Sequence, residues 1–220
     1  IVLKSLYMSR LARPDILWTV NSLAREVTKW NVACDKRLER LIAYINSTQD
    51  HVLQSFCGDD PADCQLMLFC DASFAGDLTD SKSTGGSILC IVGPNTFCPI
   101  SWICKKQGAV SHSSTEAEII AMEAAVRMEG MCALNFWDLV IDVMQPHAKP
   151  CSRTRHAPSA PDKYNHSCMQ SLPMDMQTLL SVDFVPSNIN MSPQVARMLI
   201  MEDNDAVIKM CIKGRSPNMK

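Results

Sequence analysis

The chain has 220 residues, 47% of them hydrophobic, and its 21 basic and 23 acidic side chains leave a net charge of −2. This length allows one large domain, or a domain with appendages, around a sizeable core. The near-neutral balance argues against a protein that holds nucleic acid by its overall charge alone. No apolar run approaches the roughly 20 residues that span a bilayer, so we expect no membrane partner. The first residues show neither an initiator Met nor a signal-peptide layout, so we expect a piece of a longer polypeptide.

The N-terminal residues predict two helices with a basic surface. Residues 15–27 follow Pro14 and repeat apolar side chains at helical spacing, and residues 33–46 do the same. Residues 1–48 carry eight basic and four acidic side chains, a local charge of +4. A basic lobe beside an acidic site fits a protein that processes polyanions, and a solvated helix face explains it equally well. Residues 49–65 are polar and predict a linker.

Three short strands are predicted next. Residues 65–70 form an apolar strand that ends at Asp71, and residues 85–93 form a second strand bounded by glycines. Residues 96–104 form a third, in which Pro99 indicates an edge position or a bulge. Consecutive short strands with turn signals between them predict an antiparallel meander.

A long helix is predicted from about Thr115 to Val143, with Gly130 as a break or a close packing point. Its start shows capping-box spacing twice, at Thr115 with Glu118 and at Ser113 with Glu116. Seven of the twelve prolines fall in the next stretch. Residues 144–194 therefore predict a long, poorly ordered insertion. Order returns with a strand over residues 195–201 and a short helix over residues 206–212.

Eleven cysteines are scattered through the chain without a Cys-x-x-Cys spacing, which argues against a zinc ribbon or a thioredoxin-like motif. Most lie in apolar runs, as Cys70, Cys90 and Cys211 do, so we expect reduced thiols in the core of an intracellular protein. One alternative zinc set exists inside the proline-rich stretch, but its spacing matches no compact finger; it consists of Cys151, His156, His166 and Cys168.

Three carboxylates stand at the ends of apolar strands or in the first turn of a helix. We expect Asp71 and Asp203 on neighbouring strands, with Glu118 facing them from the helix. An oxygen-only site of this kind suits hard divalent metals, and two such ions support phosphodiester hydrolysis. Each residue alone is more simply a turn residue, a cap or a partner of the helix dipole. The order strand Asp, hairpin, helix Glu, strand Asp favours the metal site.

These motifs resemble the ribonuclease H region of copia-type retrotransposon Pol polyproteins. The family pattern Asp-Ala-Asp-Trp-Ala-Gly-Asp corresponds to residues 71–77 (DASFAGD), and Lys-Ser-Thr-Ser-Gly corresponds to residues 82–86 (KSTGG). Residues 100–107 (ISWICKKQ) and 113–118 (SSTEAE) follow in the family's order. Upstream, residues 5–16 resemble the end of the reverse transcriptase. The resemblance covers most of residues 1–143 and resumes near residues 199–206.

The resemblance implies an α/β, ribonuclease H-like mixed sheet with an antiparallel meander and packed helices. Residues 1–48 would be thumb or connection helices of the reverse transcriptase, and residues 66–220 the nuclease domain, truncated at its C-terminal part. Asp71, Glu118 and Asp203 would then be the catalytic residues and the ligands of two Mg²⁺ ions, with Mn²⁺ as an alternative. The reaction implied is hydrolysis of RNA in RNA–DNA hybrids during reverse transcription.

Five further residues are candidates for substrate contacts. Lys105, Lys106 and Gln107 precede the long helix and are within reach of phosphates. Ser114 lies at the N-terminus of that helix, and Asn204 lies beside Asp203, where it suits a 2′-hydroxyl contact. Solvent-facing loop positions and helix capping explain these residues equally well. Of the two glutamates, Glu118 matches the family's, because an apolar pair and an Ala follow it, and Glu116 is read as a cap.

The chain departs from the family in three places. Ser73-Phe74 replaces the usual Asp-Trp, the proline-rich insertion replaces a short connection, and the family's fourth carboxylate would follow Lys220. The alternative interpretation is therefore a degenerate, non-catalytic remnant that acts at most as a nucleic-acid-binding module. We expect no DNA polymerisation, because the polymerase aspartates would precede Ile1. The resemblance implies the rest of the Pol polyprotein, reverse transcriptase and integrase, as partners, in cytoplasmic particles or the nucleus.

Overall fold

A mixed sheet of five strands lies at the centre of the computed structural model, which describes residues 1–77, 80–146 and 195–213. The strand order is β1-β4-β3-β2-β5. β2, β3 and β4 form the predicted antiparallel meander, and β5 pairs with β2 in parallel. The strand bounds are β1 Phe56–Cys57, β2 Gln65–Ser73, β3 Thr84–Gly93, β4 Thr96–Lys106 and β5 Met198–Met201. This mixed α/β architecture confirms the predicted fold class and is consistent with a ribonuclease H-like fold.

Alternation along the strands divides the apolar side chains between the two faces of the sheet. Leu66, Leu68 and Leu89 pack with Cys70 and Ala125 in one buried cluster, beneath the helices that follow the meander. Met67, Cys90 and Val92 form a second buried cluster. Because β2 is buried on both faces, it reads as a nearly continuous apolar run in the sequence.

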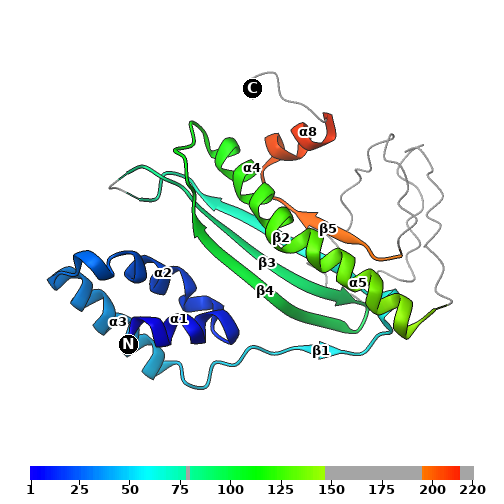
Figure 1. Cartoon of the computed structure of the whole chain (residues 1–220), viewed down its shortest axis with the longest axis horizontal. Helices are drawn as coiled ribbons and strands as arrows, with labels where there is room; N and C mark the ends of the chain where they lie inside the picture. The colour runs from blue at the N-terminus through cyan, green and yellow to red at the C-terminus, as the bar shows by residue number, and fades with distance from the viewer. Residues whose placement is uncertain (78–79, 147–194, 214–220) are drawn as a thin grey trace.

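The long helix predicted after the meander crosses one face of the sheet as α4 and α5 (Figure 1). α4 covers Ser114–Ala125 and α5 covers Met131–Met144. Buried alanines, among them Ala117 and Ala121, line the inner side of α4 and allow it to lie close to the strands. At Gly85 of β3 a Cβ atom would come within 2.9 Å of the Ala121 Cβ, so only glycine fits this approach.

A single wide turn, Val126–Gly130, separates α4 from α5, so Gly130 does mark a break. A Cβ at Gly130 would lie 3.0 Å from the Met198 side chain and 3.2 Å from that of Leu68, so it is a close packing point as well. The turn has the i→i+5 pattern of a π-helix, which often accompanies functional sites. It directs Glu129 toward the sheet, where the carboxylate accepts hydrogen bonds from Ser87 Oγ and Ser101 Oγ.

The N-terminal residues form a small helical unit with its own core. Its α-helices are α1 Val2–Leu11, α2 Leu17–Arg25 and α3 Val32–Ser47, with 3₁₀ turns at Pro14–Ile16 and Val27–Lys29. Ile16, Val20 and Leu23 are fully buried in this core. The unit is fastened to the sheet at β4, where Trp102 Nε1 donates to the Ser9 carbonyl and Asn21 Nδ2 donates to the Cys104 carbonyl, each at 2.8 Å.

The predicted linker, residues 49–65, is not entirely irregular. It contains β1, which pairs with the beginning of β4, and a 3₁₀ turn at Pro61–Asp63. The polar composition hid a strand of only two residues. Pro99 was predicted to mark an edge position or a bulge. The pairing of β3 with β4 has a β-bulge between Leu89 and Cys90, and Cys90 is the partner of Pro99. On its other side β4 pairs with β1 only at its start, so within the described residues Pro99 also lies on a free edge.

Two further expectations concern the C-terminal half. α8, Asp205–Lys213, is the predicted terminal helix. Cys70 and Cys90 are buried free thiols, as expected, whereas Cys211 is exposed on α8 and that prediction is wrong, because an apolar run on a surface helix still has an outer side. The predicted insertion, except for residues 144–146, and the four residues of the alternative zinc set lie outside the described residues.

No helix in the described ranges is both long and apolar enough to cross a bilayer.

Candidate metal centre

Parallel pairing brings two of the predicted carboxylates to the same level of the sheet. Phe69 of β2 lies opposite Met201 of β5. Asp71 comes two residues after Phe69, and Asp203 comes two residues after Met201. Because parallel strands advance together, the two aspartates reach the same edge of the sheet side by side. This is the arrangement that the sequence predicted for them.

The third carboxylate comes from α4, the helix packed against β2 and β3. Ser113 caps this helix by accepting a hydrogen bond from the Glu116 amide, and Glu116 Oε2 accepts one from the His112 amide. Glu116 therefore serves the helix start, as expected. Glu118, two residues later, turns inward and is only 7% exposed.

One oxygen from each of Asp71, Glu118 and Asp203 lies within 4.8 Å of the other two. Asp71 and Asp203 are exposed and Glu118 is buried, so the cluster has two carboxylates at its mouth and one at its base. We call this set the carboxylate cluster. Its donors are all anionic oxygens, which is the ligand type of hard divalent cations.

The electrostatics of Glu118 support the same interpretation. Burial, and then the negative charges of Glu202, Asp71 and Asp203, raise its pKa to about 7, although a hydrogen bond from the Ala72 backbone opposes the shift. Its Oε2 atom is buried and has no hydrogen-bond partner. A buried carboxylate oxygen without a donor is costly unless a proton or a cation satisfies it. The residues present therefore fit a divalent cation.

A fourth acid, Glu202, lies next to this cluster and was not among the predicted site residues. Its Oε1 accepts a hydrogen bond from the Asn204 amide at 3.3 Å, and its buried Oε2 has no partner. Burial raises its pKa, and the charges of Asp203 and Asp71 raise it further. Glu202 follows β5, which ends at Met201, and no spacing in the sequence singled it out.

The three predicted phosphate contacts at the end of β4 occupy different environments. Lys105 is exposed. Lys106 Nζ forms ion pairs with Asp77 at 2.5 Å and Asp80 at 2.8 Å, so its charge is already balanced within the protein.

Gln107 is buried rather than placed in a solvent-facing loop. Its Nε2 donates to the Ala117 carbonyl at 2.8 Å, and its Oε1 accepts from Ser111 Oγ at 2.9 Å. These bonds fix the segment before α4 to the first turn of that helix. The position of Gln107 thus differs from the expected one, because its amide is used inside the fold.

The other two candidates lie at helix N-termini. Ser114 is exposed, and the cap of α4 is its neighbour Ser113. Asn204 caps α8, since its Oδ1 accepts hydrogen bonds from the amides of Ala206 and Val207. Substrate contacts of Lys105, Lys106, Gln107, Ser114 and Asn204 stay predictions.

Comparison with known proteins gives relatives for most of the chain. It is 29% identical over 180 residues to the retrovirus-related Pol polyprotein from transposon RE2 of Arabidopsis thaliana, covering 79% of this chain and 12% of that polyprotein. The corresponding polyprotein from transposon RE1 of the same plant is 30% identical over 175 residues, 79% of this chain and 11% of its own length. The chain thus spans about an eighth of these relatives.

A third relative is short. The secreted RxLR effector protein 161 of Plasmopara viticola is 32% identical over 122 residues, which cover 56% of this chain and 81% of that protein. No family model and no solved structure matches the chain.

Proposed function

The chain belongs to the retrovirus-related Pol polyproteins of copia-type transposons, and from this membership we propose that it is their ribonuclease H-like portion, which hydrolyses RNA in RNA–DNA hybrids. The observation that carries the proposal is the meeting of Asp71, Glu118 and Asp203 within 4.8 Å of one another. We assign residues 1–48 to the end of the reverse transcriptase and residues 66–220 to the nuclease domain. The rest of the polyprotein is the proposed partner.

Each residue of the carboxylate cluster has a distinct part in the proposed site. Asp71 and Asp203 are exposed, so they hold a cation on the side from which a nucleic acid approaches. Glu118 holds it from below, in a water-poor position where its charge acts strongly. When bound, Mg²⁺ or Mn²⁺ would activate a water molecule and stabilise the leaving 3′ oxygen. Strand ends and a helix packed on the sheet are stiff supports for such a site.

The hybrid would be recognised by its shape, phosphates and 2′-hydroxyls rather than by its base sequence. Lys105 is the strongest candidate for a phosphate contact, because it is exposed and close in sequence to the start of α4. Lys106 is less available, since Asp77 and Asp80 already bind its ammonium group. Asn204 is adjacent to Asp203, and its side-chain amide group is the part that a 2′-hydroxyl would meet.

The test is a cleavage assay on an RNA–DNA hybrid with Mg²⁺, compared with a DNA duplex of the same sequence. We expect cleavage of the RNA strand only, and a decrease of at least about a hundredfold in Asp71→Asn, Glu118→Gln and Asp203→Asn. Glu123→Gln is the matched control, because Glu123 lies on α4 but pairs with Arg127 at the surface. It should cleave at the wild-type rate.

Cleavage that survives Asp71→Asn and Glu118→Gln together would rule the nuclease assignment out. A wild-type chain that binds the hybrid without cleaving it, and gains no stability from Mg²⁺, would support the alternative of a non-catalytic remnant. The two outcomes can be distinguished. In the first, the double variant still cleaves the hybrid, and in the second, the wild type does not cleave it.

A further inference from the structure

A series of buried hydrogen bonds lies at the end of the sheet that carries the carboxylate cluster. Its polar side chains are those of Ser83, Gln107 and Ser111, and all three are buried. The Ser83 hydroxyl accepts a hydrogen bond from the Ala75 amide at 3.1 Å, and the Ser83 carbonyl accepts one from the Gln107 amide at 2.9 Å. Ser111 Oγ donates to Gln107 Oε1 at 2.9 Å, and Gln107 Nε2 donates to the Ala117 carbonyl at 2.8 Å. These bonds join the loop after β2, the segment between β4 and α4, and the first turn of α4.

The two ends of this series lead to two of the carboxylates. Ala75 follows Asp71 by four residues, just after β2. Its φ of 48° lies in the left-handed region, which an alanine seldom adopts unless its surroundings hold it there. The bond to the serine hydroxyl fixes this turn. At the other end, Ala117 directly precedes Glu118 in α4.

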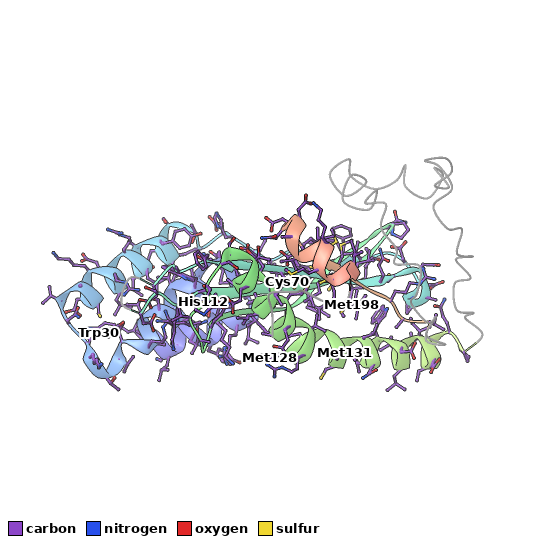
Figure 2. All side chains as sticks on the ribbon, turned by 90° about the horizontal axis from the view of Figure 1, so that it is seen from above. Trp30, Cys70, His112, Met128, Met131 and Met198 are labelled. Atoms are coloured by element: carbon purple, nitrogen blue, oxygen red, sulfur yellow. The ribbon has the colours of Figure 1, made fainter. Side chains whose placement is uncertain are left out.

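Gln107 is the residue that connects the end of a strand with the helix. It follows Lys106, the last residue of β4, and its amide group reaches α4. His112 marks the N-terminal end of this helix in Figure 2. Gly85 of β3 leaves room there, because a Cβ at this position would lie 2.9 Å from the Ala121 Cβ and 3.9 Å from Gln107 Nε2. The amide carries no charge and both of its polar atoms are used within the fold, so it supports the helix without competing for a cation.

We propose that Gln107 is a positioning residue of the carboxylate cluster, which fixes Glu118 relative to Asp71 at the spacing that a divalent cation needs. It acts through the Ala117 carbonyl on one side and through Ser83 on the other. The inference rests on the proposed function, because it assigns a residue to the same site. One oxygen of each carboxylate lies within 4.8 Å of the other. Two carboxylates this close repel each other without a cation, so the fold has to hold them together before the cation binds.

The Mn²⁺ affinity of folded variants tests this role. Mn²⁺ is titrated into the full chain, free Mn²⁺ is measured by electron paramagnetic resonance, and urea denaturation without metal gives the stability. Gln107→Met keeps the length of the side chain and removes both of its hydrogen bonds, so we expect Mn²⁺ binding to weaken about tenfold or more. Ser83→Ala removes the acceptor of the Ala75 amide and should weaken binding in the same direction by a smaller factor. If Gln107→Met does not fold, Ser83→Ala decides the question.

Thr96→Val is the matched control. Thr96 is buried at the other end of β4, where its hydroxyl accepts hydrogen bonds from the amides of Gly58 and Asp59, each at 3.1 Å. The variant therefore also removes two buried hydrogen bonds, but neither of them leads to the carboxylate cluster. It should lower the urea midpoint, as Gln107→Met does, and bind Mn²⁺ with the affinity of the wild type.

Three results overturn the inference. If folded Gln107→Met and Ser83→Ala bind Mn²⁺ as the wild type does while Asp71→Asn does not bind it, Gln107 supports only the fold and the nuclease proposal stands. If Thr96→Val weakens binding as much as Gln107→Met, the affinity follows general stability and Gln107 has no special part. If the wild type binds no Mn²⁺ at all, the proposed metal centre fails together with the inference.

Discussion

The N-terminal helical unit and the carboxylate cluster both withdraw acidic groups from water, and they differ in what meets those groups. In the helical unit Arg13 holds both oxygens of Asp15, at 2.8–3.2 Å, and Tyr44 donates to the same carboxylate at 3.0 Å. Arg13 also donates to the carbonyl and the hydroxyl of Thr48. At the carboxylate cluster the buried Oε2 atom of Glu118 has no donor, and neither has Oε2 of the neighbouring Glu202.

This difference distinguishes charged groups that bind one another inside the fold from charged groups that are available to a ligand. Arg13 and Asp15 tie the 3₁₀ turn before α2 to Thr48, the residue after α3, through hydrogen bonds within the protein. Removing one partner of such a pair is costly, because the other charge is left without compensation. Glu118 and Glu202 each keep one buried oxygen, Oε2, without a donor, so its desolvation is left to be compensated by a bound cation or proton. Unsatisfied acids, rather than buried acids in general, are what distinguish the candidate site.

The largest effect on the free energy of unfolding is expected from Arg13→Ala. The change removes the Arg13 donors from Asp15, which keeps only the hydrogen bond from Tyr44, and from the Thr48 carbonyl. It should lower stability by roughly 3 kcal/mol. This loss is at the lower end of what breaking a buried ion pair costs, because the Asp15 side chain is 34% exposed. Urea denaturation measures it, with the exposed Arg10→Ala on α1 as control. A loss below about 1 kcal/mol would show that the helical unit does not depend on this pair.

The opposite behaviour is expected of Glu118→Gln. Without metal this variant should be at least as stable as the wild type, because it removes a buried charge that has no partner. With Mn²⁺ at a hundred times its dissociation constant, the wild type should gain about 2.7 kcal/mol and the variant should gain nothing. Denaturation with and without Mn²⁺ measures both quantities. Equal gains in the two proteins would place the cation elsewhere.

A smaller effect should appear when the helical unit is acidified. The hydrogen bonds and charge of Arg13 lower the pKa of Asp15, with a smaller contribution from Tyr44. An acid with a lowered pKa stabilises the fold above its unfolded value, about 3.9, and this contribution decreases as the pH falls through the lower folded value. Wild type and Asp15→Asn should therefore differ in urea midpoint at pH 5 and converge toward pH 2. A constant difference across this range would contradict the assignment.

The smallest effect is expected at Asp205, two residues beyond Asp203. On α8 its Oδ2 pairs with Lys209 Nζ at 3.4 Å, and both side chains are well exposed. Asp205→Asn should change the free energy of unfolding by less than about 0.5 kcal/mol and leave Mn²⁺ binding unchanged. Calorimetric titration checks the second point. If Asp205→Asn lost a Mn²⁺ ion, Asp205 would be an additional ligand of the cluster. An exposed acid would then bind the cation as well as a buried acid without a donor does.

Much of the fold could be predicted because its elements carry strong local signals. The apolar run before Asp71 and the glycine-bounded run of β3 predicted the meander, and Gly130 marked the division between α4 and α5. β1 was missed, since two residues in a polar segment carry no periodic signal and depend entirely on pairing with β4. α1 was expected only from the resemblance, because its apolar side chains do not gather on one side.

The candidate site was predictable where it follows from strand ends and helix starts, as for Asp71, Asp203 and Glu118. Glu202 was overlooked because it directly precedes Asp203, and two adjacent acids in the sequence look like parts of one turn. Gln107 was misplaced for a related reason, since a polar residue after two lysines suggests a surface loop, whereas the fold uses its amide to hold Ala117 and Ser111. Hydrogen bonds between segments are not encoded in local composition.

The parallel pairing of β2 with β5 also sets the order in which the molecule is completed. Asp71 and Asp203 are about 130 residues apart along the chain, whereas β2, β3 and β4 follow one another directly. Contacts between distant segments form slowly, so the meander can assemble early and β5 docks late. A polypeptide emerging from the ribosome as far as α5 carries two of the three acids and lacks the last. Translation must pass residue 203 before the carboxylate cluster is complete.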